Sequence, residues 1–191
     1  AALSVSGLLE NRVGGPSVFP PQPDVVAKEG FSNVWKTSDG ADRYRRGLYT
    51  WIQRLSPFAQ YVTFDAPPTN TSCTRRDRSN SPLQALTLLN DGVFFEAAQA
   101  MSRSVLVEPA ADDNDRLNRI VLRALSRPAS PEELLILADC LREQRLLLEA
   151  APEKATLIAP EPVYTIPAAE VAAWTSVCSV VLNLHEFITR E

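Results

Sequence analysis

Three arginines stand close together between Thr74 and Pro82, in the stretch TRRDRSNSP, and their spacing suggests chemistry. The guanidinium groups of Arg75, Arg76 and Arg78 carry planar pairs of donors that fit sulfate, phosphate and carboxylate. A helix is expected to begin just after them, and its first amide groups would add positive potential there. One interpretation of this stretch is therefore a site for an anion.

The same arginines also have a structural interpretation, which we favour. Between Ser56 and Ser81 the sequence shows no regular pattern, and irregular segments of that length leave many carbonyl groups without partners. Arginine offers five donors to such carbonyls and to acids of the loop, here Asp65 and Asp77. On this interpretation the arginines clamp the loop. Asp65, in the motif FDAP, is then a turn residue or an arginine partner rather than a buried general base.

Aromatic residues are concentrated just before this loop, in the stretch YRRGLYTWIQRL of residues 44–55. Part of it alternates apolar and other side chains, which favours a strand, although a short helix fits as well. Tyr49, Trp51 and Tyr61, together with Tyr44, have flat faces on which sugar rings stack. These residues form either a carbohydrate platform or an aromatic core around an irregular scaffold, and we favour the core.

Several kinds of chemistry lack the residues they need. His185 is the only histidine, which excludes a histidine-rich metal site, and we expect it to be a polar residue at a helix end. Cys73, Cys140 and Cys178 match no metal spacing, and the heme-attachment motif C-x-x-C-H is absent. We therefore expect no metal and no cofactor in this chain.

Charge and hydropathy limit the partners. The chain of 191 residues has a net charge of -4, which argues against nucleic-acid binding through charge. No apolar run is long enough to predict a membrane span. Apolar residues make up 45% of the chain, enough to bury a sizeable core.

The pattern of apolar residues predicts a mainly α fold, with four or five helices in residues 82–191. Pro82 opens the first helix after the N-cap Ser81, and a stripe that includes Leu86 and Leu89 is expected to face inward, with a break at residues 90–92. Further helices are predicted at 115–126, from a capping box that starts at Ser130, and at 168–189.

The remaining segments are predicted to be less regular. Residues 1–13 resemble the last turns of a helix stopped at Gly14, and residues 151–167 resemble a link of low order. We expect one domain over residues 1–191, the carboxy-terminal part of a larger one. Its residues 1–81 would wrap a helical bundle of residues 82–191 and could contain one short strand pair.

Four stretches carry a family resemblance: YRRGLYTW (44–51), FDAP (64–67), CTRRDRSNSPLQALTLLND (73–91) and NLHEFITRE (183–191). Together they resemble a carboxy-terminal domain of unknown function in large planctomycete proteins, where it lies downstream of a cytochrome-c-like module. The resemblance covers essentially the whole chain.

The resemblance implies an extracytoplasmic location, whether secreted, periplasmic or at the cell surface. It implies upstream domains of the same protein as partners, a c-type heme in an associated module, and a connection with polysaccharides. In such a compartment Cys73 could pair with Cys178, although three separate small apolar residues remain the favoured alternative. We expect a non-catalytic scaffold or binding module that docks a c-type cytochrome module or holds an extracellular glycan. The alternative is part of a polysaccharide-active oxidoreductase or hydrolase, whose site is shared with upstream residues and includes Asp65 and the arginines.

Overall fold

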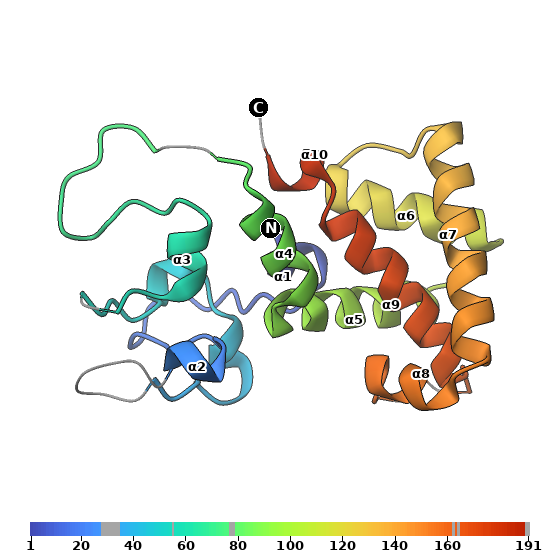
Figure 1. The fold of residues 1–191 in the computed structure, drawn as a ribbon, viewed down its shortest axis with the longest axis horizontal. Helices are drawn as coiled ribbons and strands as arrows, with labels where there is room; N and C mark the ends of the chain where they lie inside the picture. The colour runs from blue at the N-terminus through green and yellow to red at the C-terminus, as the bar shows by residue number, and fades with distance from the viewer. Residues whose placement is uncertain (28–34, 55, 77–78, 162, 164, 190–191) are drawn as a thin grey trace. The chain divides into compact units, whose positions relative to one another are not determined.

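The computed structural model describes residues 1–27, 35–54, 56–76, 79–161, 163 and 165–189. These residues are mainly helical, and extended pairing among them is limited to isolated bridges (Figure 1). The chain divides into two compact units. One, called the helical unit, comprises Ala1–Leu8 and Phe94–Glu191, and the other, called the irregular unit, comprises Leu9–Val93. The mainly α fold is thus confirmed.

The helical unit is built around one central helix, α9 (Ala168–Leu182), which contacts α6, α7, α8 and α10. Most of its side chains are apolar, and residues such as Trp174 and Cys178 are fully buried. The surrounding helices are α1 (Ala2–Val5), α5 (Gly92–Val107), α6 (Asp113–Leu125), α7 (Pro131–Glu149), α8 (Pro152–Ile158) and α10 (His185–Ile188).

The predicted N-terminal signals of the helices are confirmed. At the start of α7, the Ser130 Oγ accepts a hydrogen bond from the Glu133 amide at 3.2 Å, and the Glu133 carboxylate accepts one from the Ser130 amide at 2.7 Å. Pro131 occupies the first helical position, where no amide hydrogen is needed. The capping box therefore fixes where α7 begins.

Three expectations about the ends of segments are wrong. The helix predicted over residues 168–189 ends at Leu182, and α10 begins separately at His185. The opening helix ends at Val5, well before Gly14, because Gly7 adopts the left-handed conformation (φ 79°) that ends a helix. The link expected to have low order contains α8. This helix is held because Ala155 is buried and because the Gln99 side chain donates to the Ile158 carbonyl at 2.6 Å.

The irregular unit contains only short elements: α2 (Asp24–Ala27), the 3-10 helices η1 (Gly40–Tyr44) and η2 (Gly47–Tyr49), α3 (Ala59–Thr63) and α4 (Pro82–Asn90). The alternating stretch forms η2 and then a single bridge between Thr50 and Val18. Val18 donates to the Tyr49 carbonyl and accepts from the Trp51 amide, both at 2.8 Å. Pro20, which has no amide hydrogen, follows closely and cannot extend the ladder.

Helix α4 has the predicted bounds but not the predicted inner face. The break at residues 90–92 is confirmed, with the Asp91 carboxylate accepting from the Val93 amide at 2.9 Å. However, Leu86 and Leu89 are 58% and 45% exposed, whereas the polar Gln84 is buried. The predicted stripe is therefore wrong at Leu86 and Leu89, because α4 turns Gln84 and Leu88 inward. Its continuation in the next helix is confirmed, since Val93, Ala97, Met101 and Val105 are buried. Helix α4 belongs to the irregular unit, whereas the sequence grouped it with the bundle.

Candidate functional site

A chain of aromatic contacts forms the core of the irregular unit. Trp35 and Phe58 stack with their ring centroids 5.5 Å apart and their planes 10° apart, and Phe58 meets Tyr61 edge-on at 5.2 Å. Phe19 touches both Trp35, at 5.1 Å, and Trp51, at 5.9 Å. Trp35 and Phe58 are buried, whereas Trp51 is 47% exposed. The cluster is therefore a core on one side and an open aromatic surface on the other.

A groove of about 240 Å³ lies at this open side. Among the described residues that line it none is charged, and two of the predicted platform residues, Trp51 and Tyr61, are brought together there. The other lining residues are Ile52, Gln53, Pro57, Phe58, Val62, Ala66, Pro67, Pro68 and Thr69. The groove, called the aromatic groove below, is thus mostly apolar with a few polar groups, as in many ligand sites.

Tyr61 is held in the groove by the backbone of Gly47. Its hydroxyl donates to the Gly47 carbonyl at 2.5 Å. A Cβ atom at position 47 would lie 2.8 Å from the same hydroxyl, closer than real Cβ contacts allow. The glycine of the YRRGLYTW motif therefore lets the Tyr61 ring reach its place.

Tyr49, the third predicted platform residue, does not line the groove. Its ring lies 3.7 Å beneath the guanidinium of Arg45, and its hydroxyl accepts from the Gly14 amide at 2.9 Å. Arg45 is only 2% exposed and donates through Nη2 to the carbonyls of Arg12 and Gly14, at 2.6 and 2.7 Å. Tyr49 and Arg45 together anchor the loop around Gly14.

Arg45 was not predicted to have such a role, although it belongs to the motif YRRGLYTW. An arginine next to aromatic residues and paired with a Gly-Gly turn elsewhere could have indicated the anchor, because a glycine turn exposes carbonyls that need donors. Its Nε and Nη1 atoms have no hydrogen-bond partner among the described residues.

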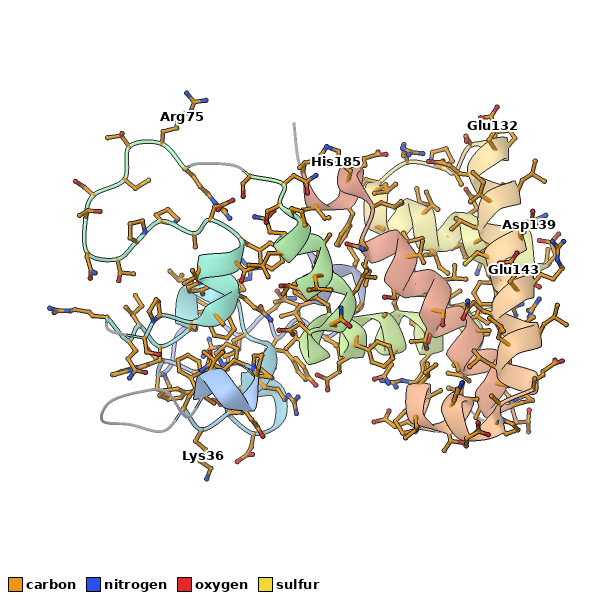
Figure 2. All side chains as sticks on the ribbon, in the orientation of Figure 1. Lys36, Arg75, Glu132, Asp139, Glu143 and His185 are labelled. Carbon is orange, nitrogen blue, oxygen red and sulfur yellow. The ribbon has the colours of Figure 1, made fainter. Side chains whose placement is uncertain are left out.

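Arg76 makes the contacts that the clamp interpretation predicts. Its Nε donates to the Asp65 carbonyl at 3.0 Å and its Nη2 to the Phe64 carbonyl at 2.5 Å. Arg75 is exposed and points away from the loop (Figure 2). Arg78 and Asp77 lie outside the described residues. Arg76 therefore faces the loop and Arg75 faces solvent, so the two guanidinium groups do not converge on one anion site.

Asp65 is a turn residue with a positive φ of 53°. Its Oδ2 accepts hydrogen bonds from the Ser79 amide at 2.9 Å and from the Ser79 hydroxyl at 2.6 Å. These bonds lower the pKa of Asp65, so its carboxylate is ionised at neutral pH. A general base needs a pKa nearer to the working pH, and Asp65 does not line the aromatic groove.

Gln84 joins the FDAP turn to helix α4. Its Nε2 donates to the Thr63 carbonyl and the Ser79 hydroxyl, both at 2.9 Å, and to the Asp65 carboxylate at 3.1 Å. Its Oε1 accepts from the Ser81 amide at 3.2 Å. Residues 66–69, which follow Asp65 in the chain, form one wall of the groove. The buried Gln84 side chain therefore holds the start of this wall in place.

All three cysteines are free thiols in the structure, and pairing of Cys73 with Cys178 stays a prediction. Cys178 is fully buried in the middle of α9, where it packs as a small apolar residue, and burial raises the pKa of its thiol. Cys73 is exposed, with its sulfur 3.0 Å from the Arg75 carbonyl. The alternative of separate apolar cysteines fits Cys178 and not Cys73.

His185 begins α10 and is exposed, as expected of a polar residue at a helix end. Within the described residues, no three side chains of His, Cys, Asp or Glu gather where they could hold a metal. The helices of the described residues include none with the length and hydropathy to cross a membrane.

Comparison with known families identifies the chain. Residues 1–141 match the model of the family PSD1, protein of unknown function (DUF1553). Because the match covers well over half of the sequence, the chain belongs to this family. Searches of curated proteins and of solved structures found no match.

Proposed function

We propose that the chain is a non-catalytic binding module of an extracytoplasmic multidomain protein, and that it holds a neutral glycan in the aromatic groove. One observation carries the proposal. An exposed tryptophan, Trp51, and Tyr61 flank a groove whose described lining has no charged residue. Such a surface offers flat apolar faces to a sugar ring and no acid or base to break its bonds.

The size and lining of the aromatic groove suit part of a glycan rather than a whole drug-sized ligand. Its volume of about 240 Å³ is smaller than most ligand pockets, so one ring of a longer chain would fill it. The Gln53 amide and the Thr69 hydroxyl, at the edges of the apolar faces, are of the type that bonds sugar hydroxyls.

The location and the neighbouring module rest on the family resemblance. That resemblance supports an extracytoplasmic protein in which this chain lies beside a c-type cytochrome module. Fractionation of the source cells, followed with an antibody against this chain, tests the location. The heme absorption of the protein purified through the same antibody tests the association with a cytochrome.

The enzyme alternative requires Asp65 and the arginines at the wall of an open pocket. The bonds of Asp65 to Ser79 and of Arg76 to main-chain carbonyls support the binding module instead. These bonds support a structural role for both residues in the loop.

A thermal melt with a panel of neutral and sulfated glycans tests the proposal. A neutral glycan should raise the midpoint, by an amount that corresponds to about 2.7 kcal/mol at a concentration one hundred times its dissociation constant. Trp51→Ala should abolish the rise, and Leu48→Ala, at an exposed residue that does not line the groove, should keep it. A rise with sulfated glycans alone that fades in salt would overturn the proposal in favour of an anion site.

A further inference from the structure

Helix α7 carries apolar side chains on two opposite faces. One face is buried in the helical unit, and the outer face is apolar near both ends of the helix. Leu137, Leu141 and Leu148 are buried in the helical unit. On the opposite side of the same helix, four aliphatic side chains are between 62% and 70% exposed: Leu135, Ile136, Leu146 and Leu147. Clustered exposed apolar side chains of this kind mark interaction surfaces.

The centre of this face is charged. Asp139 and Arg142 form an ion pair, with 3.0 Å between Oδ1 and Nη2, and their side chains are 62% and 67% exposed. Glu132, Asp139 and Glu143 can be followed along α7 in Figure 2. Leu135, Asp139, Arg142 and Leu146 follow one another at spacings of four, three and four residues. This is the spacing of the contact seam in paired helices.

The order of residue types along the seam is the same from either end of the helix: a leucine, two charged residues and a leucine. We propose that it binds the same face of a second copy of this chain, with the two α7 helices antiparallel and a twofold axis between Cys140 and Leu141. Leu135 of each copy then meets Leu146 of the other copy. Asp139 of each copy meets Arg142 of the other, which gives two ion pairs across the axis.

The residues beside the seam fit the same arrangement. Ile136 and Leu147 lie on one flank of the seam, and antiparallel helices bring this flank against the same flank of the other copy. Glu132 and Glu149 face each other only at the exposed ends, where solvent screens their repulsion.

The charges of α7 favour a protein copy over a lipid surface. Helices that bind anionic membranes carry Lys and Arg around their apolar side chains. Here Glu132, Asp139 and Glu143 accompany a single exposed arginine, Arg142. A partner with matched positive and negative charges in the middle and apolar groups on both sides fits better, and a second α7 has that pattern.

Sedimentation of the full chain over a range of concentrations tests the proposal. The wild type should pass from a monomer of 21.0 kDa to a dimer as concentration rises. Asp139→Arg and Arg142→Asp should each weaken the dimer by about tenfold or more, because each places like charges across the axis. Lys154→Asp, a charge reversal on α8, should leave dimerisation unchanged.

Mixing the two variants gives the decisive result. An Asp139→Arg copy and an Arg142→Asp copy have complementary seams, so an equimolar mixture should form a heterodimer that neither forms alone. Heterodimer formation also shows that both variants are folded. The intrahelical ion pair is lost in both variants and cannot account for their recovery on mixing.

The apolar contacts have their own control. Leu135→Glu should dissociate the dimer, whereas Leu48→Glu, at a leucine of the irregular unit that is 87% exposed, should not. A wild type that stays monomeric at every concentration overturns the proposal. So does a dimer that is indifferent to both charge reversals, or a mixture of the two variants that stays monomeric.

Discussion

Four arginines, two in each unit of this molecule, bind different kinds of acceptor. In the helical unit, Arg127 bonds the carboxylates of Glu133 and Glu186, at 2.8 and 2.6 Å, and Arg145 likewise bonds acidic side chains. In the irregular unit, Arg45 and Arg76 donate instead to main-chain carbonyls. These arginines therefore link helices in one unit and hold loops in the other, although Arg12 of the irregular unit pairs with Asp42 and Arg119 of the helical unit also donates to the Pro109 carbonyl.

The difference follows from what each kind of backbone leaves unpaired. A helix satisfies most of its own carbonyls, so the donors on its surface find carboxylates. A long loop leaves carbonyls that need donors, and arginine reaches several at once. The net charge of each unit fits this difference, because carboxylates are in excess only in the helical unit. The irregular unit has ten Lys and Arg against eight Asp and Glu, a net +2, and the helical unit has nine against fifteen, a net -6.

The largest effect is expected in the core of the helical unit. Trp174 is fully buried on α9, and its Nε1 donates to Glu170 at 2.8 Å. Trp174→Ala leaves a large cavity and should lower the free energy of unfolding by about 4 kcal/mol. Urea titration followed by circular dichroism measures the change. Trp51→Ala, at an exposed ring, is the control and should cost much less.

The next effect tests the anchor of the irregular unit. Arg45→Ala removes the two hydrogen bonds to Arg12 and Gly14 and leaves their carbonyls and the space around them unfilled. We expect a loss of about 3 kcal/mol in the stability of this unit. Amide hydrogen exchange in residues 9–27 and 35–54 measures it. Unchanged protection there would show that the buried guanidinium does not hold the loop.

A smaller effect tests the clamp. Arg76→Lys keeps the charge but loses the planar fork that reaches Phe64 and Asp65, so the loop should lose about 1 kcal/mol of local stability. Limited proteolysis of residues 56–76 reports the change. Arg75→Lys, at the exposed neighbour, should cleave at the wild-type rate. Because the acceptors are neutral carbonyls, added salt should leave the difference between Arg76→Lys and wild type nearly unchanged.

The smallest effect concerns acid and the helical unit. Arg127 and the Ser130 amide lower the pKa of Glu133 to about 2, from an ordinary value of 4.5. The ionised carboxylate therefore stabilises the folded state above about pH 4.5, and this stability is lost as the pH falls from there toward 2. Because the Glu133 side chain is 34% exposed, solvent screening keeps the contribution below about 1 kcal/mol.

Thermal melts between pH 7 and pH 2 measure this contribution. Glu133→Gln should flatten the part of the acid dependence that Glu133 causes, and the Arg76 clamp should contribute none of it. An acid dependence that is identical in Glu133→Gln and wild type would contradict the assignment.

Features set by local signals were predictable from the sequence. The capping box at Ser130, the proline at the start of α4 and the break after Asn90 were predicted, because each depends on a few neighbouring residues. The start of α9 at residue 168 was predicted as well.

Features set by distant contacts were not predictable. The buried face of α4 is decided by Gln84, whose partners Thr63 and Asp65 lie about twenty residues away. Arg45 is buried because a glycine turn about thirty residues earlier needs donors. The aromatic groove itself depends on Gly47, Tyr61 and the prolines after Asp65 meeting in space, which no local pattern encodes.

Quenching of tryptophan fluorescence tests the central claim, that a glycan binds at Trp51, most directly. Of the three tryptophans, Trp35 and Trp174 are buried and Trp51 is 47% exposed, so a soluble quencher such as acrylamide reports mainly on Trp51. Adding a neutral glycan that raises the melting temperature should protect this emission from the quencher, and Trp51→Phe should remove the quenchable signal. A glycan that stabilises the chain while Trp51 stays fully quenchable would place the ligand elsewhere and contradict the account.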